Sequence, residues 1–256
     1  MEVLNMTSER IITILIPFPK ELDVNGDFGN IQTIQRRLTW YGYTPKIAVW
    51  QGGELPTGID IMLTGGGMDS GLKAVYPHFT EHKADFKAMA ADGVAMLLVG
   101  GMYQMFGRSF MLDGNKLEGL GLLDVTSGKA PEKYDGNIVA QSSRFGEVVG
   151  YEIHETVTKL GQTATPLCET VTKGTGNNAD DHNEGVIAGT LIGTYMNGPI
   201  LPKNPAVADY LIEAAAKHRY GSFEPTAKPE DFPVAAFIGN ARKVAASRPV
   251  MQAARI

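Results

Sequence analysis

Cysteine, basic clusters and long apolar runs are all scarce in this sequence. The single cysteine among 256 residues, Cys168, excludes an internal disulfide framework. A net charge of −5, with no dense stripe of lysine and arginine, argues against nucleic-acid binding. No apolar segment approaches the length that crosses a bilayer, and the run 11–16 is too short for a signal peptide. We therefore expect a cytoplasmic protein without membrane insertion.

The remaining pattern is typical of a single α/β domain covering residues 1–256. Hydrophobic residues make up 43% of the chain and charged residues 20%, as in ordinary globular domains. Apolar, β-rich segments at 11–16, 46–50, 59–64 and 94–99 alternate with helical patterns, which predicts a mostly parallel sheet flanked by helices. After residue 110, short strand and turn patterns predict an antiparallel extension of that sheet.

Four helical segments can be placed. The first begins near Gly29 and keeps Ile31, Ile34, Leu38 and Tyr41 on one face. The region 70–92 should be broken by Pro77 into a short turn and a longer helix with Phe79, Phe86 and Met89 directed inward. Asn204 and Pro205 should begin a helix through Lys217, and a last helix should cover 233–247.

The segment Val99-Gly-Gly-Met-Tyr-Gln104 resembles a nucleophile elbow that has no nucleophile. A buried strand, 94–99, leads directly through a turn into a helix, which is where α/β hydrolytic enzymes present an attacking side chain. At such a tip, backbone N–H groups stabilise a thiolate or an oxyanion. The tip here consists of Gly100 and Gly101, which offer no sulfur, hydroxyl or amine.

Several separated motifs resemble the class I glutamine amidotransferases of the cobyric-acid-synthase type (CobB/CobQ), and most closely the GatD type, the glutaminase subunits of lipid II isoglutaminyl synthase. The resemblance implies the flavodoxin-like fold of that class. The matching stretches are Asp27-Phe-Gly-Asn-Ile31, 60–69, 103–107, 117–124, 149–152, 176–178 and 191–204.

The resemblance implies that the reactive groups of this family have been lost. The family's catalytic cysteine matches Gly100, its second elbow glycine matches Met102, and its general-base histidine matches Asn197, whose amide takes no proton near neutral pH. Lys133 stands where the family has a substrate-binding arginine, and a lysine is a poor replacement for a bidentate carboxylate clamp. We further expect Gly100 to enlarge the pocket and Met102 to refill it.

The resemblance also assigns the remaining site residues. In the loop Gly65-Gly-Gly67, backbone N–H groups would face the elbow across the cleft as an oxyanion hole. A simple strand-to-helix turn fits the same residues, and their spacing is not that of a dinucleotide-binding fingerprint, so no cofactor is expected. The expected substrate-binding residues are Gly66, Gly67, Gly101, Tyr103, Gln104 and Lys133.

Other reactive side chains are weaker candidates. Cys168 lies in an apparent half-buried strand and is predicted to be inert, and His154 reads as a hydrogen-bonded histidine at a strand end rather than a relocated base. Ser109 and Thr194 have no evident base beside them. Asp180, Asp181, His182 and Glu184 resemble metal ligands in composition, but their spacing favours a solvated loop and no metal is expected.

The resemblance implies a role in amidating the D-glutamate of peptidoglycan stem peptides. The family works beside a Mur-ligase-like subunit as a heterodimer, and where Pro199 replaces the third triad residue, that subunit would supply the acidic group. We expect this chain to be a binding subunit unable to hydrolyse glutamine itself. Two alternatives stay open: an active amidohydrolase or transferase with repurposed residues, and a sensor that binds a small-molecule ligand in the cleft.

The stretch 193–204 keeps the family pattern around the lost base, with Gly198-Pro-Ile-Leu-Pro202 on a proline-fixed loop. Two interpretations of it stay open. The loop either docks the partner through Ile200, with an exposed apolar patch at the cleft mouth, or merely closes the core.

Overall fold

The computed structural model describes residues 9–250. Its strands are β1 (Ile11–Pro17), β2 (Thr44–Trp50), β3 (Ile61–Leu63), β4 (Ala95–Val99), β5 (Ser109–Leu112), β6 (Asn115–Glu118), β7 (Val125–Ser142), β8 (Gly146–Leu160), β9 (Thr170–Lys173), β10 (Val186–Ala188), β11 (Leu191–Thr194) and β12 (Met196–Asn197). Its α-helices are α1 (Pro19–Leu22), α2 (Phe28–Trp40), α3 (Asp69–Glu81), α4 (Lys83–Asp92), α5 (Gly101–Met105), α6 (Pro205–Tyr220) and α7 (Ala235–Ser247), with short 3-10 helices η1 (Leu201–Lys203) and η2 (Pro229–Asp231).

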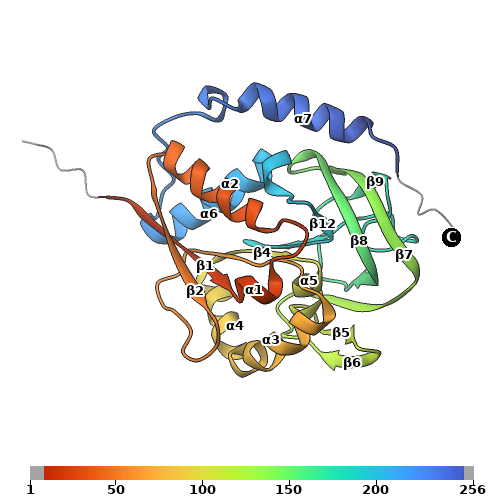
Figure 1. Ribbon diagram of the computed structural model, residues 1–256. Helices are drawn as coiled ribbons and strands as arrows, with labels where there is room; N and C mark the ends of the chain where they lie inside the picture. The colour runs from red at the N-terminus through yellow and green to blue at the C-terminus, as the bar shows by residue number, and fades with distance from the viewer. Residues whose placement is uncertain (1–8, 251–256) are drawn as a thin grey trace, which may run out of the picture.

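The predicted parallel sheet is confirmed. Its strand order is β10-β11-β4-β3-β1-β2, and every neighbouring pair is parallel except the edge pair of β10 and β11. All four predicted strand segments belong to it. The predicted antiparallel part is also present and forms a second sheet, β12-β8-β7-β5-β6, with β9 paired to β7. Figure 1 shows this second sheet, coloured green to cyan, beside the end of the central sheet at which α5 begins.

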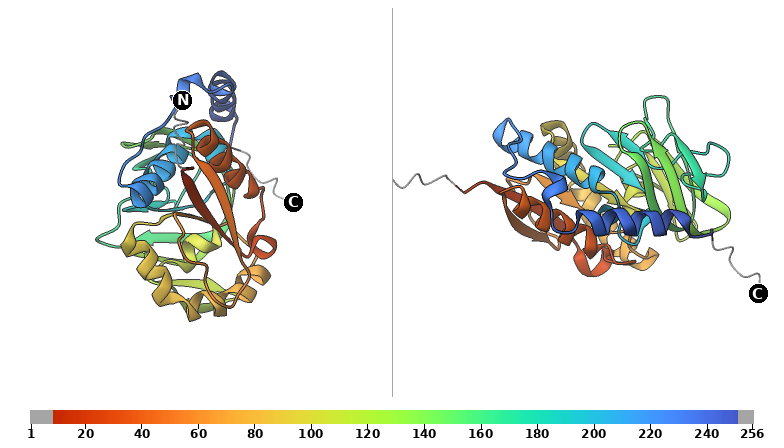
Figure 2. Two further views of the ribbon diagram at one scale, coloured as in Figure 1. Left: turned by 90° about the vertical axis from the view of Figure 1, so that its left-hand side faces the viewer. Right: turned by 90° about the horizontal axis from the view of Figure 1, so that it is seen from above.

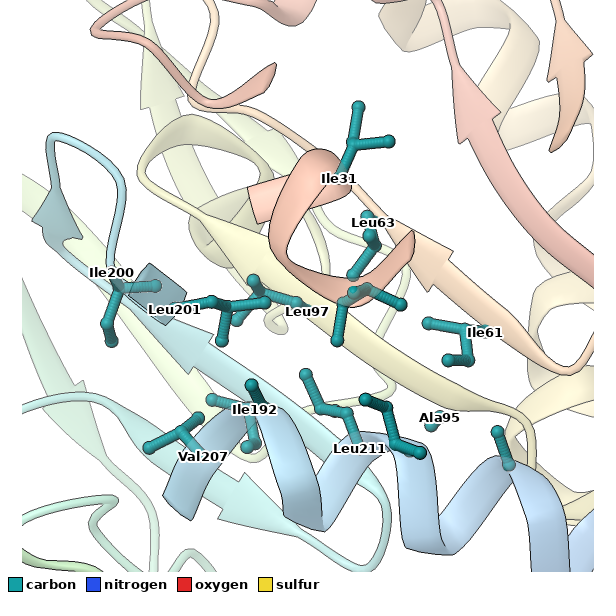
Figure 3. Packing of buried hydrophobic residues seen from close by; sticks show 14 of the residues in the cluster. Ile31, Ile61, Leu63, Ala95, Leu97, Ile192, Ile200, Leu201, Val207 and Leu211 are labelled. Carbon is teal, nitrogen blue, oxygen red and sulfur yellow. The ribbon is translucent and has the colours of Figure 1, made fainter. Parts of the chain in front are cut away.

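Two apolar layers cover the central sheet because its strands are hydrophobic on both faces. On β4, Ala95 and Leu97 face a layer that includes α2 and α6, whereas Met96 and Leu98 face a layer that includes α3, α4 and α5. Figure 3 shows the first layer, where Val207 and Leu211 of α6 lie against the strands. Figure 2 shows α7 running along the outside of the molecule. None of the helices in residues 9–250 is long and apolar enough to cross a membrane.

The first and last predicted helices are confirmed, but the effect of Pro77 was predicted wrongly. Helix α3 runs through Pro77 and stops at Glu81, so the break comes at His82. Pro77 is exposed, and the Lys73 carbonyl that loses its helical partner is also on the solvent side, where water can satisfy it. The rings of Phe79 and Phe86 stack across the break with their centroids 5.0 Å apart, and this contact packs α3 against α4.

Candidate functional site

The predicted elbow is present at the carboxyl end of β4. Gly100 has φ 55° and ψ −117°, a conformation that is easy for glycine and strained for other residues. Its N–H donates to the carbonyl of Thr194 (2.9 Å), which joins the turn to β11. A Cβ at this position would lie 3.2 Å from the Cα of Gly66, so the turn directs position 100 at the glycine loop. The backbone of a nucleophile elbow therefore persists without the nucleophile.

The Gly65–Gly67 loop does face the elbow, but the predicted orientation of its N–H groups was wrong. The Gly66 N–H donates to the Asp27 carboxylate (2.9 Å) and the Gly67 N–H to the carbonyl of Leu22 (3.3 Å). The Gly66 carbonyl instead accepts the Gly101 N–H at 3.2 Å. An oxyanion at the elbow would meet this carbonyl oxygen and find the Gly101 donor already engaged.

Asn197 lies beside the same loop. It is only 3% exposed, and its Nδ2 donates to the carbonyl of Tyr195 (2.8 Å). Its Oδ1 is buried without a hydrogen-bond partner and would be 3.8 Å from a Cβ on Gly66. The elbow, the glycine loop and the position of the lost base therefore meet within a few ångströms.

These residues line a cleft of about 610 Å³ between the carboxyl ends of the parallel strands and the second sheet. The carboxyl ends of parallel strands are where ligands commonly bind in α/β proteins. Of the residues expected to form the site, those that line the cleft are Gly66, Gly67, Gly100, Gly101, Gln104, Lys133 and Asn197. Gln104 donates to the hydroxyl of Thr156 (3.1 Å) in β8.

Lys133 forms an ion pair with a neighbouring carboxylate of the protein. It lies in the irregular stretch of β7 between Lys129 and Tyr134, and its ammonium group pairs with Asp135 at 2.9 Å. The hydrogen bond that the Lys133 ammonium donates to the Asp135 carboxylate raises the pKa of Lys133 above its usual range. Lys133 is thus an exposed cation at the mouth of the cleft, where a substrate carboxylate would compete with Asp135.

Tyr103 and Met102 do not line the cleft, contrary to expectation. The Tyr103 side chain is fully buried, packs directly on Gly193 and donates to the side chain of Asn177 (3.1 Å). Met102 is fully buried in the layer under α3 and does not refill the pocket. Gly101 and Gln104 are three positions apart and lie on one face of α5, and they are the two residues of this helix that reach the cleft.

The weaker candidates also have defined positions. Cys168 is fully buried at an isolated bridge to Glu184, not in a half-buried strand, and burial raises its pKa above the usual range. Glu184 was wrongly placed in a solvated loop: Asp180, Asp181 and His182 are exposed, but Glu184 is fully buried and accepts from Thr194 and Tyr195. Within residues 9–250, no group of three acidic, histidine or cysteine side chains is arranged to hold a metal ion.

Sequence reasoning left two groups out of the site. His154 lies within β8 rather than at a strand end, lines the cleft, and stacks on Tyr195 with ring centroids 3.9 Å apart. Asp27 is buried below the glycine loop, and burial raises its pKa from 3.8 to about 7. The motif that begins at Asp27 was the available signal, but nothing in it indicates that the carboxylate holds Gly66.

Asp27 should make stability depend on pH. Its pKa is raised in the folded state, so between about pH 4 and 7 folding takes up a proton and stability falls as the pH rises. In Asp27→Asn this dependence disappears, so the stability of the variant relative to wild type should rise by about 2–3 kcal/mol from pH 5 to pH 8. Urea unfolding at both pH values measures this, and Glu184, whose pKa burial also raises to about 7, cancels in the difference. If the free energy of unfolding changed equally with pH in wild type and in Asp27→Asn, this prediction would be wrong.

Comparison with known proteins agrees with this geometry. Residues 16–205 match the model of the CobB/CobQ-like glutamine amidotransferase domain. The chain is 34% identical over 219 residues to the lipid II isoglutaminyl synthase (glutamine-hydrolyzing) subunit GatD of Staphylococcus aureus, covering 84% of this chain and 88% of that protein. It is 35% identical over 138 residues to cobyric acid synthase of Listeria welshimeri, covering 50% of this chain and 24% of that protein.

Solved structures show the same fold at low sequence identity. A glutamine amidotransferase crystal structure has a TM-score of 0.55 at 15% identity, covering 79% of this chain and 98% of that one. A glutamine amidotransferase from Thermotoga maritima has a TM-score of 0.52 at 14% identity, covering 91% of this chain and 93% of that one. On the match over residues 16–205, with an elbow, a facing glycine loop and a cleft in place, the chain belongs to the CobB/CobQ-like glutamine amidotransferase family.

Proposed function

We propose that this chain is a GatD-like subunit of a peptidoglycan-amidating enzyme that does not itself hydrolyse glutamine. The observation that carries the proposal is a formed elbow with Gly100 at its tip and Asn197 beside it. A cysteine-type hydrolase needs its nucleophile and base as a unit, and loss of either member removes most of the rate. The carbonyl of Gly66 at the elbow adds a third deficit, because it replaces an oxyanion donor.

The side chains that remain do not offer a replacement. Cys168 lies in the core and does not line the cleft. Thr156 is the one hydroxyl among the described lining residues, and its oxygen already accepts from Gln104 and donates to Tyr195 (3.0 Å). His154 directs Nδ1 at the backbone carbonyl of Thr156 (2.8 Å), not at that hydroxyl, so it does not activate it. Hydrolysis by repurposed residues is therefore disfavoured.

In this proposal the partner is a Mur-ligase-like subunit that activates the α-carboxyl of D-glutamate with ATP and takes free ammonia in place of ammonia from glutamine. The relative from Staphylococcus aureus is named as one subunit of a glutamine-hydrolysing enzyme, which supports a two-component assembly. Met68, which lines the cleft, is 66% exposed, and Phe28, the residue after Asp27, is 48% exposed. The hydrogen bond between Asp27 and Gly66 brings their segments together, so these two apolar side chains are candidates for the contact.

The test is to purify the chain with the ligase subunit and to measure lipid II amidation with glutamine or with ammonium chloride as nitrogen source. We expect amidation with ammonium chloride and ammonia release from glutamine no higher than in a buffer control, because the site has no nucleophile. A family member with an intact Cys-Gly-Gly elbow is the positive control. Glutamine-dependent amidation above the control would contradict the proposal, and so would failure of the two subunits to associate.

A further inference from the structure

Helix α7 presents an apolar strip to solvent. Phe237 is 73% exposed, the highest value among the large apolar side chains of residues 9–250, and Val244, two turns further along, is 54% exposed. Ala241 is also exposed and lies between them on the same face of the helix. Figure 2 shows this helix on the outside of the molecule. The strip of Phe237, Ala241 and Val244 is therefore uncovered in the part of the chain that the structure describes.

Hydrogen bonds on the opposite side of α7 hold the helix in this orientation. The Arg242 guanidinium donates to the carbonyls of Lys203 (2.9 Å) and Glu147 (2.6 Å). At the carboxyl end of the helix, Lys173 Nζ in β9 donates to the carbonyl of Ala246 at 2.5 Å. Because these bonds fix the inner face of α7, the outward direction of the apolar strip is a built feature of the fold.

The charge beside the strip is positive. Residues 232–250 contain three basic residues and no acidic residue, although the whole chain has a net charge of −5. Burial and then the charge of Arg248 lower the pKa of Lys203, so these two cations lie near each other. The basic cluster at the carboxyl end of α7 comprises Lys173, Lys203, Arg242, Lys243 and Arg248. Within residues 9–250, none of its members forms an ion pair with a carboxylate.

The acidic residues that adjoin α7 do not neutralise this cluster. Glu147 contacts Arg242 through its main-chain carbonyl. Glu230 and Asp231 belong to η2, which precedes the amino end of the helix, whereas the cations gather at the carboxyl end. The uncompensated positive charge therefore requires an anionic partner.

An exposed phenylalanine beside unpaired cations is typical of a helix that lies on an anionic membrane surface. Apolar side chains enter the headgroup region, and lysine and arginine side chains contact the lipid phosphates. A stable protein interface buries roughly 800 Å² on each partner, far more than one phenylalanine, one valine and one alanine provide. With 13 residues, α7 is too short to span a bilayer, so it would lie flat on the surface.

We propose that α7 docks on the surface of an anionic lipid bilayer, with Phe237 and Val244 among the headgroups and Lys243 and Arg248 on the lipid phosphates. The inference goes beyond the proposed function and uses no residue of the cleft. Helix α7 also lies outside residues 16–205, the part of the chain that matches the family domain. A lipid-linked substrate would be present at the same surface.

The test is sedimentation of the purified chain, without a ligase subunit, with vesicles of equal parts phosphatidylglycerol and phosphatidylcholine. We expect a partition coefficient at least about tenfold higher than for vesicles of phosphatidylcholine alone, because each cation gains from the anionic surface. Binding should fall when sodium chloride is raised from about 50 mM to about 500 mM, because salt screens the attraction. Equal partition into the two kinds of vesicle, or none into either, would overturn the proposal.

Matched variants locate the contact. Lys243→Glu should lower partition into the mixed vesicles at least about tenfold. Lys46→Glu, at an exposed position on β2, changes the net charge equally and should stay within about twofold of wild type. Equal losses in the two variants would show that net charge alone acts, and that α7 is not the docking surface.

A second pair of variants tests the apolar contact. Phe237→Ser should weaken binding to the mixed vesicles about tenfold and Val244→Ser about threefold, because each removes apolar area from the headgroup region. Val49→Ser on β2 is 49% exposed, close to the 54% of Val244, and should bind like wild type. All three positions are exposed, so melting temperatures should stay close to that of wild type. Unchanged binding of Phe237→Ser would remove the strip from the contact.

Another occupant of the strip would give a different result. If a second copy of this chain covered it, the protein would dimerise in analytical ultracentrifugation, Phe237→Ser would be monomeric, and vesicles would not bind, which would overturn the proposal. The vesicle assay contains neither ligase nor glutamine. Its failure therefore leaves the proposed function standing, and glutamine hydrolysis by the assembled enzyme would leave the lipid contact standing.

Discussion

Ile200→Asp is expected to unfold the protein. Ile200 is fully buried in the layer that contains α2 and α6, and it lies beside Leu201 in Figure 3. The substitution removes a buried apolar side chain and leaves an unpaired carboxyl in its place, at a cost of at least about 5 kcal/mol, which is comparable to the whole stability of many domains. Thermal and urea unfolding of the purified variant measure this, and we expect little folded protein at 25 °C.

Two further variants calibrate the result. Ile200→Val keeps the apolar character and should cost about 1 kcal/mol. Val49→Asp introduces the same charge at a β2 position that is 49% exposed, and should cost less than about 1 kcal/mol. A folded Ile200→Asp variant with unchanged melting temperature would place Ile200 at the surface, as the docking interpretation of its loop predicted. The structure instead supports the interpretation in which this loop closes the core.

A thiol introduced by Gly100→Cys should be far more reactive than the native cysteine. The new side chain would point at Gly66 in the cleft, where we expect the N–H groups of Met102 and Tyr103 in α5 to lower its pKa even though the Gly101 N–H is bonded to Gly66. Cys168 is fully buried with a raised pKa, so alkylation at position 100 should be at least roughly 100-fold faster. The positive φ of 55° should reduce stability by about 1–3 kcal/mol. Mass spectrometry of iodoacetamide-treated protein gives both rates.

Gly189→Cys is the matched control for this experiment. Gly189 has nearly the same φ, 56°, and no atom lies within 4 Å of its Cβ position, so it provides an open thiol at another positive-φ position. A rate at position 100 several-fold above that at position 189 would measure the effect of the elbow. A thiol at position 100 as unreactive as Cys168 would show that Gly100 does not occupy the elbow tip. We expect no glutaminase activity from this single change, because Asn197 and the Gly66 carbonyl remain.

The features that the sequence predicted correctly have strong local signals. The strand before Gly100 is apolar throughout and is followed by two glycines, so the strand-turn-helix order could be inferred without the structure. The orientation of the peptide groups in the glycine loop was harder to predict. Three consecutive glycines permit either orientation of the Gly66 peptide, and the choice depends on Asp27, which lies 39 positions away.

The errors concern burial, which depends on distant parts of the chain. Tyr103 and Met102 belong to a helix of only five residues, too short for its periodicity to show which face is buried. For Ile200, flanking prolines fix the backbone but do not indicate what the side chain contacts. The buried Glu184 follows three exposed polar residues closely, and it is held inward by the backbone bridge to Cys168 and by the donors of Thr194 and Tyr195.

The contacts of α5 bear on how the cleft responds to a ligand. Tyr103 bonds to Asn177 and Gln104 bonds to Thr156, so this short helix ties the central sheet to the segment and strand on the opposite side of the cleft. The Tyr103 ring also sits against Gly193, where a Cβ would come within 2.2 Å of it. Opening the cleft by a hinge would require breaking these two hydrogen bonds while the ring stays packed on β11. The two walls therefore form one mechanical unit, and a ligand should enter a cavity of nearly constant width.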